Sequence, residues 1–264
     1  MLAFATAFST VAPNVTISWS PGNGMTPMNG SWIASHNGKF GVMYRVTPDF
    51  HDDGWPALRS KLDVASNYAA LIDANGTFPD LDMLPLGLQS RGNGVPPTPC
   101  KFTHNEQTLL MTLWSIVRAP LIIGALLPLE QDDVWTLNLL TNKVMLQVNA
   151  ASYGNAPTTL AIPAPGPAAD GLYAWTACLN DDSDAIIVAL FNSADTNVTS
   201  MGISLPGTAG SDVHCTDAPS PCWTAVDNWS GEAVPGTFSS GTFQASVSAH
   251  GAGFFTVRRG GPGC

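Results

Sequence analysis

The spacing of apolar residues in this 264-residue chain changes once, near residue 150, and this change limits the possible folds more than any other feature. Before it, short apolar runs alternate with stretches in which apolar residues recur every three or four positions, as on one face of a helix. After it, strand-like runs follow one another with turn residues between them. The first pattern predicts parallel β/α units, and the second predicts an antiparallel β-sandwich.

The first region, residues 1–152, contains predicted strands and helices in alternation. We predict strands at residues 15–19, 40–45, 83–86 and 121–124, helices at 55–72, 106–117 and 134–140, and a last apolar run at 144–148. The helix at 106–117 has a start signal, because Thr103 lies three residues before Glu106 in a capping-box arrangement. The N-terminal stretch predicts a further helix that ends near Pro13, since it lacks the positive segment of a signal peptide.

The second region, residues 158–260, predicts an antiparallel β-sandwich. Its strand-like runs lie at residues 172–178, 185–191, 199–205, 243–247 and 253–257. The stretch between the two regions, residues 153–167, is dominated by Ala, Pro and Gly, so we place the domain boundary there.

Charge and hydropathy exclude two classes of partner. Lys and Arg total 10 and Asp and Glu total 20, which gives a formal net charge of −10. A nucleic-acid-binding surface needs the opposite balance, so no nucleic-acid partner is expected. The apolar stretch 109–129 is broken by Arg118, Pro120 and Pro128 and does not predict a membrane span.

The glycosylation sequons, together with the low content of charged residues, favour a secreted or lysosome-like location. Of five cysteines, Cys215 and Cys222 lie close together in a stretch rich in Thr, Pro, Ser and Asp, where we expect a local disulfide; the alternative is two unrelated thiols. The pairing of Cys100, Cys178 and Cys264 is left open. Paired Cys-x-x-Cys motifs are absent from the sequence, so no metal or other cofactor is expected. The sequons expected to carry glycans are those of Asn29, Asn75, Asn197 and Asn228.

Candidate catalytic and sugar-binding residues lie at the end of one predicted strand and around the start of another. The run at 40–45 ends in Arg45 and leads to Asp49, while Asp80, Asp82 and Met83 surround the start of the run at 83–86. Loops at the carboxyl ends of parallel strands converge over one face. Arginine and carboxylates there would suit a sugar site, in which carboxylates act as acids and bases. The alternative is that these are solvated loop aspartates.

Three patches carry a resemblance to a known family. Residues 17–22 (ISWSPG) resemble a strand that ends in Ser-Pro-Gly, residues 44–50 (YRVTPDF) an aromatic-Arg-x-Ser-x-Asp stretch, and residues 78–87 (FPDLDMLPLG) the motif Trp-Pro-Asp-x-Asp-Met-Leu-Pro-Leu-Gly. The order of these patches resembles the second half of a melibiase-type α-galactosidase of glycoside hydrolase family 27. The sequences WSG at 229–231 and AHG at 249–251 are similar to that family's C-terminal sandwich.

The resemblance implies about the last four units of a (β/α)8 barrel, followed by the sandwich. It also implies a retaining glycosidase that cleaves terminal α-galactosyl groups from galactosides or related oligosaccharides, with two carboxyl groups about 5–5.5 Å apart. Carried over by motif, Asp49 matches the acid/base and Arg45 the arginine that reaches the sugar. Asp82 and Met83 match pocket residues, and Asp80 matches a supporting carboxylate.

The sequence also departs from the family pattern. The family's nucleophilic aspartate lies in a Lys-x-Asp context upstream of the strand that matches residues 15–19, and this chain has no such sequence there. We therefore expect the chain by itself to lack the nucleophile and to be inactive. The alternatives are a sugar-binding remnant without activity and a truncated gene product. An open half barrel would also expose sheet edges, through which the chain is expected to self-associate.

Overall fold

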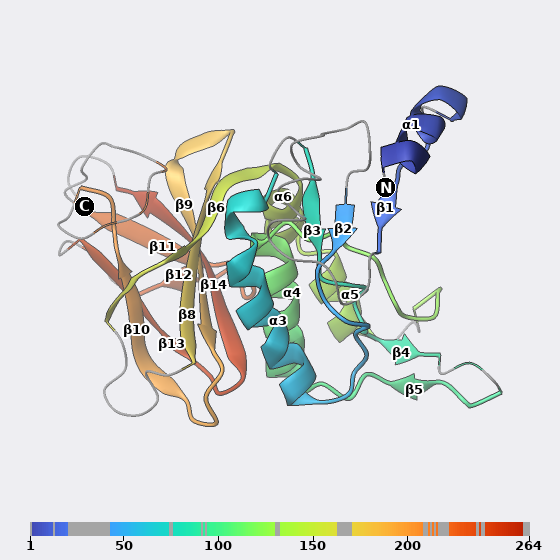
Figure 1. The fold of residues 1–264 in the computed structure, drawn as a ribbon. Coiled ribbons are helices and arrows are strands. Elements are labelled where there is room, and N and C mark those ends of the chain that lie inside the picture. The colour runs from blue at the N-terminus through green and yellow to red at the C-terminus, as the bar shows by residue number, and fades with distance from the viewer. Residues whose placement is uncertain are drawn as a thin grey trace. The chain divides into compact units, whose positions relative to one another are not determined.

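The computed structural model describes residues 2–12, 14–20, 43–73, 76–90, 92, 94–129, 133–162, 171–207, 211, 213, 215, 222–235, 238 and 241–260. Two compact units make up the chain (Figure 1). Unit 1 consists of residues 1–101 and 117–129, and unit 2 of residues 102–116 and 130–264. The domain division expected between residues 152 and 158 stays a prediction.

Unit 1 is organised around a three-stranded parallel sheet. Its strands β1 (Ser18–Trp19), β2 (Met43–Arg45) and β3 (Phe78–Asp80) pair in the order β1-β2-β3. Helix α3 (Trp55–Asn67) and the short 3-10 helix η2 (Ala69–Leu71) lie between β2 and β3 in the chain. Parallel neighbours need such a crossover, so this segment is a β/α unit, as the apolar spacing predicted. Helix α1 (Leu2–Val11) is the predicted N-terminal helix.

The third predicted strand is displaced in the structure. The strand is Phe78–Asp80 and not residues 83–86, and the predicted strand at 121–124 contributes a single parallel bridge between Leu84 and Ile123. Proline and aspartate are rare in strands, so the composition of residues 78–80 did not predict β3. Within the described sheet β3 pairs on one side only, so the missing N–H of Pro79 costs little. Strands β4 (Leu88–Gln89) and β5 (Thr98–Pro99) form a small antiparallel pair.

Unit 2 contains the antiparallel β-sandwich (Figure 1). A six-stranded sheet has the order β12-β11-β14-β9-β8-β6, and a three-stranded sheet has the order β13-β10-β7. The predicted strands of this region are confirmed. The bounds are β6 (Ser152–Thr158), β7 (Leu160–Ile162), β8 (Leu172–Leu179), β9 (Asp182–Asn192), β10 (Val198–Ser204), β11 (Trp223–Asp227), β12 (Ala233–Val234), β13 (Thr242–Val247) and β14 (Gly251–Arg259).

The two sheets of unit 2 share one apolar core. Val188 on β9, Ile203 on β10 and Trp223 on β11 are almost fully buried in it. The rings of Phe243 and Phe255 meet edge to face at 5.0 Å between centroids, a favoured aromatic geometry. On β9 every second residue, Ile186, Val188 and Leu190, belongs to this core, as expected for one face of a strand.

Three helices also belong to unit 2: α4 (His104–Ile116), α5 (Val134–Leu140) and α6 (Lys143–Ala151). The predicted capping box is confirmed, because the Thr103 N–H donates to the Glu106 carboxylate at 2.7 Å and the Glu106 N–H donates to the Thr103 hydroxyl at 3.3 Å. Helix α4 packs against the sandwich, where the indole N–H of Trp229 donates to the Thr112 hydroxyl at 3.0 Å.

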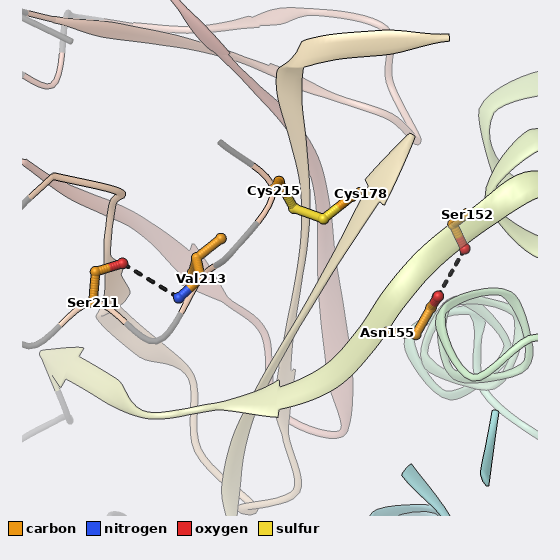
Figure 2. The surroundings of a disulfide bond; sticks show 6 residues. All are labelled: Ser152, Asn155, Cys178, Ser211, Val213 and Cys215. Atoms are coloured by element: carbon orange, nitrogen blue, oxygen red, sulfur yellow. Dashed lines mark hydrogen bonds between the residues drawn. A yellow bond between two sulfur atoms is a disulfide. The ribbon is translucent and has the colours of Figure 1, made fainter. Parts of the chain in front are cut away.

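The disulfide prediction is wrong. Cys215 pairs with Cys178 at the end of β8, with the Cα atoms 5.1 Å apart, and not with Cys222 (Figure 2). Cys222 is also disulfide-bonded. Proximity in sequence misled the prediction, since the fold places Cys178, 37 positions away in the chain, beside Cys215. Closing a loop of that length stabilises a fold by about 4 kcal/mol in the chain-entropy model.

The four predicted glycosylation sites differ in what the structure describes of their exposure. Asn29 and Asn75 lie outside the described residues. Asn197 is exposed, and its side-chain oxygen accepts the Ala249 N–H at 2.9 Å. Asn228 is only 6% exposed and its Nδ2 is buried, so the prediction of a glycan there is wrong for the folded chain. No described helix is long and apolar enough to cross a membrane.

Candidate active site

The candidate site of unit 1 begins at the end of strand β2. Successive residues of a strand point to opposite faces. Tyr44 is fully buried, and its ring lies 6.4 Å from that of Tyr68, just beyond α3. Arg45 therefore points to the other face, where its side chain is 14% exposed. The chain then enters the loop that carries Asp49.

One guanidinium group joins two of the predicted carboxylates. Nη2 of Arg45 forms an ion pair with Oδ2 of Asp82 and lies 3.2 Å from Oδ1 of Asp49. The two partners differ sharply in exposure, at 7% for the Asp82 side chain and 89% for that of Asp49. The structure thus brings together three residues that the sequence placed on two separate loops. One carboxylate is fixed within the unit and the other faces solvent.

Asp82 is held in a backbone conformation that few residues other than glycine adopt. Its φ is +86°, a left-handed value that surrounding contacts must hold in place. The Asp82 N–H donates to Oδ1 of Asp80 at 2.8 Å, and Oδ1 of Asp82 accepts the Met83 N–H at 2.8 Å. Oδ2 of Asp82 accepts the Phe50 N–H as well as Arg45. These hydrogen bonds aim the Asp82 carboxylate at Arg45.

Asp80 lies at the carboxyl end of β3, and the displacement of that strand explains its position. Its side chain is buried, and this burial raises the pKa of the carboxyl group. The hydrogen bond from the Asp82 amide and the charge of Arg45 oppose the rise. Asp80 therefore supports Asp82 through its backbone.

Met83 supplies the apolar part of the site. It is 40% exposed, and its thioether lies beside Gly124. A Cβ on Gly124 would approach the Met83 sulfur to 3.1 Å and the Leu84 carbonyl oxygen to 2.9 Å, so the absence of a side chain there leaves room for both. Guanidinium, carboxylates and an exposed apolar group together can bind the hydroxyls and the apolar face of a sugar.

Three residues outside the predicted set support this site, and of these sequence reasoning missed Lys61 altogether. The Thr47 hydroxyl donates to the Leu81 carbonyl at 2.9 Å, and Oδ2 of the buried Asp52 accepts the Lys101 N–H at 3.0 Å. Lys61 is 3% exposed and donates to the Pro48 carbonyl at 3.1 Å. A signal for Lys61 existed, because it lies on the apolar face of its helix together with Leu58, three residues earlier.

The described residues contain no cluster of three or more His, Cys, Asp or Glu side chains that could hold a metal ion.

Comparison with protein families identifies the sandwich. Residues 169–257 match the family model described as the α-galactosidase C-terminal β-sandwich domain. No curated protein matches the chain.

Solved structures of similar fold are glycoside hydrolases. A family 27 β-L-arabinopyranosidase from Geobacillus stearothermophilus aligns with a TM-score of 0.77 and 24% identity over 98% of this chain and 53% of its own. A putative α-N-acetylgalactosaminidase from Bacillus halodurans has a TM-score of 0.65 and 25% identity over 81% of this chain and 45% of its own. An α-galactosidase from Saccharomyces cerevisiae has a TM-score of 0.64 and 16% identity over 98% and 67%.

The chain spans about half the length of the two bacterial enzymes. At identities below 25%, the arabinopyranosidase and the yeast enzyme show similarity of fold alone. The family model and the structural neighbours nevertheless point in the same direction. The resemblance to the melibiase-type glycosidases of glycoside hydrolase family 27 is therefore confirmed, and residues 169–257 match the model of the α-galactosidase C-terminal β-sandwich domain.

Proposed function

We propose that unit 1 contributes the acid/base side of a retaining α-galactosidase active site, built on the second half of a (β/α)8 barrel. Asp49 is the acid/base, Arg45 and Asp82 bind the sugar, Met83 contacts its apolar face and Asp80 supports Asp82. The single observation that supports this most is the guanidinium group of Arg45, which pairs with both the buried Asp82 and the exposed Asp49.

Exposure suits Asp49 to its proposed role. An acid/base must reach the leaving-group oxygen and later a water molecule. At 89% exposure the Asp49 carboxyl group can do both, while its contact with Arg45 limits the positions that it occupies. A retaining mechanism also needs a carboxylate nucleophile about 5–5.5 Å from the acid/base.

Neither buried carboxylate of the site is placed to be that nucleophile. Both oxygens of Asp82 accept hydrogen bonds, from Met83, Phe50 and Arg45. Asp80 is buried and accepts the Asp82 N–H. We therefore assign the nucleophile to the part of the barrel that the longer structural neighbours contain and that this chain does not match.

The test joins this chain to the unmatched barrel half of the Geobacillus enzyme and compares Asp49→Ala with Asp53→Ala, an exposed aspartate of the same loop. Asp49→Ala should lower kcat/KM about 10³-fold for galactosides with poor leaving groups and less than about tenfold for activated aryl galactosides, because an activated leaving group needs little protonation. Azide should restore turnover of the aryl substrate and give α-galactosyl azide. Equal losses on both substrates would remove Asp49 from this role.

A second candidate function is sugar binding without turnover. The saturated hydrogen bonding of Asp82 favours it, since this site could hold a sugar while lacking a nucleophile. Galactose, arabinose and N-acetylgalactosamine should be titrated into the chain by calorimetry. Binding of galactose without hydrolysis in the fusion protein would select this function, and a preference for arabinose would replace galactose as the proposed sugar.

The remaining proposals concern location and assembly. We infer a secreted or lysosome-like compartment because the Cys178–Cys215 disulfide needs an oxidising environment to form. We also propose self-association through unit 1, where Ile122, Ile123 and Leu127 are 40% to 66% exposed. Sedimentation velocity should show a concentration-dependent rise in mass, which Ile123→Ser should reduce.

A further inference from the structure

A buried ammonium group lies beneath the loop that carries Asp49. Lys61 projects from the apolar face of α3, beside Leu58, Leu62 and Ala65, and is only 3% exposed. Lysine is almost never fully buried unless its charge is paired or hydrogen-bonded. Its surroundings should therefore show what its charge interacts with.

Lys61 contacts the chain on both sides of Asp49. Its Nζ donates to the carbonyl oxygen of Pro48 at 3.1 Å and lies 4.7 Å from the centroid of the Phe50 ring, over its face. A cation within about 6 Å of an aromatic centroid is attracted to the ring. The residue before Asp49 and the residue after it are thus held by one side chain.

Phe50 connects this contact to Asp82. Its ring is buried under Lys61, while its N–H donates to Oδ2 of Asp82, the oxygen that also pairs with Arg45. The backbone at Asp49 is therefore fixed from two directions, by an ammonium group on the helix side and by a carboxylate on the site side. The side chain of Asp49, at 89% exposure, has far less packing to hold it.

We propose that Lys61 is a positioning residue for Asp49. It fixes the Pro48 carbonyl and the Phe50 ring so that the exposed carboxyl group of Asp49 keeps one place beside Arg45. This inference rests on the proposed acid/base function of Asp49. The precision matters because a displacement of about 1 Å in a catalytic group can cost on the order of 10²-fold in rate.

The charge of Lys61 is costly, which argues against a role in packing alone. The pKa of Lys61 is lowered to about 8, chiefly by burial and also by the charge of Arg45, while Asp82, Asp49 and Asp80 oppose the change. Leucine would fill the apolar face of α3 without this cost. What leucine lacks is the hydrogen bond to Pro48 and the cation over Phe50. Both weaken when the amine loses its proton above pH 8.

The decisive measurement uses the 264-residue chain and needs no turnover. Hydrogen exchange of the Phe50 amide reports its bond to Asp82, and exchange at Leu62 in α3 serves as the internal reference. Lys61→Met should speed Phe50 exchange about tenfold relative to Leu62, which corresponds to 1.4 kcal/mol. Lys61→Arg should restore most of the protection. The matched control is Arg59→Met, which removes an exposed charge from the same helix and should change nothing.

A second measurement separates positioning from loss of folded protein. In the fusion protein, Lys61→Met should lower kcat/KM about tenfold for poor leaving groups and less than about threefold for activated aryl galactosides. Equal losses on both substrates would overturn the proposal, as would unchanged Phe50 exchange in Lys61→Met, or in Lys61→Gln if the methionine variant does not fold. If no variant turns over, including the parent, the proposed function fails, while the exchange result still decides whether Lys61 holds the loop.

Discussion

The two units of this molecule satisfy their side chains in different ways. In unit 2, two antiparallel sheets share a continuous apolar core, and the ion pairs Arg258–Asp182 and Arg259–Asp184 are partly exposed. In unit 1, a short parallel sheet carries a network of buried charges around Arg45, Lys61, Asp80 and Asp82. Unit 2 therefore buries mainly apolar side chains, whereas unit 1 also buries charged side chains of its candidate site.

One segment of unit 1 concentrates exposed apolar side chains. Ile122, Ile123, Leu126 and Leu127 lie together in the chain of unit 1 and are 38% to 66% exposed. Parallel sheets are normally covered on both faces, and exposed apolar area forgoes about 25 cal/mol per Å² of burial. We expect unit 1 to be the less stable of the two and the more sensitive to loss of single charges.

The largest expected effect concerns catalysis. The 264-residue chain should hydrolyse nitrophenyl α-galactoside at least about 10⁴-fold more slowly than the fusion protein, because an acid/base without a nucleophile cannot form the covalent intermediate. Release of nitrophenol by the purified chain measures this. Turnover within a hundredfold of the fusion protein would show that unit 1 already holds a complete site.

The next largest effect should come from the buried charge network. Asp82→Asn leaves Arg45 without its buried partner, and loss of one member of a buried ion pair costs about 3–5 kcal/mol. Urea unfolding followed by hydrogen exchange should show this loss in unit 1 and not in the strands of unit 2. Asp49→Asn is the matched control, since its exposed side chain pairs with the same arginine and should cost less than about 1 kcal/mol.

Much of the fold of the two units could be predicted from the sequence. Strands β8, β9, β10, β13 and β14 follow from short strand-like runs separated by turn residues, and the start of α4 follows from Thr103 and Glu106. These signals are local, so sequence reveals them. The motifs around Arg45 and Asp82 likewise predicted the residues that the structure brings together.

The failures share a different cause, which is contact between distant segments. The partner of Cys215 depends on where β8 ends, and the burial of Asn228 depends on Thr256, whose hydroxyl donates to the Asn228 side-chain oxygen at 2.8 Å. Strand β3 depends on pairing with β2, because its own composition disfavours a strand. Spacing alone cannot predict these features.

A smaller effect should appear in the pH dependence of stability. The pKa of Lys61 is about 8 in the folded chain and 10.5 ordinarily, because burial disfavours the charged form. Below pH 8 the folded chain carries the full cost of the charge. Between pH 8 and 10.5 the unfolded chain binds more protons, so the free energy of unfolding should rise with pH by about 1–3 kcal/mol relative to Lys61→Met. Urea midpoints of both proteins at pH 7 and pH 10 measure this, and parallel curves would contradict it.

The smallest effect should come from the charges of unit 2. Arg258 on β14 pairs with Asp182 on β9, with side-chain exposures of 49% and 23%. This pair is more exposed than the Arg45–Asp82 pair of unit 1, so water and salt weaken it more strongly. Arg258→Ala should therefore cost less than about 1 kcal/mol. The cost should fall further in 0.5 M salt, whereas the cost of Asp82→Asn should change little because that pair is buried. Urea unfolding at two salt concentrations tests both. A cost of Arg258→Ala above 2 kcal/mol would mean that surface charge, and not only the shared core, stabilises the sandwich.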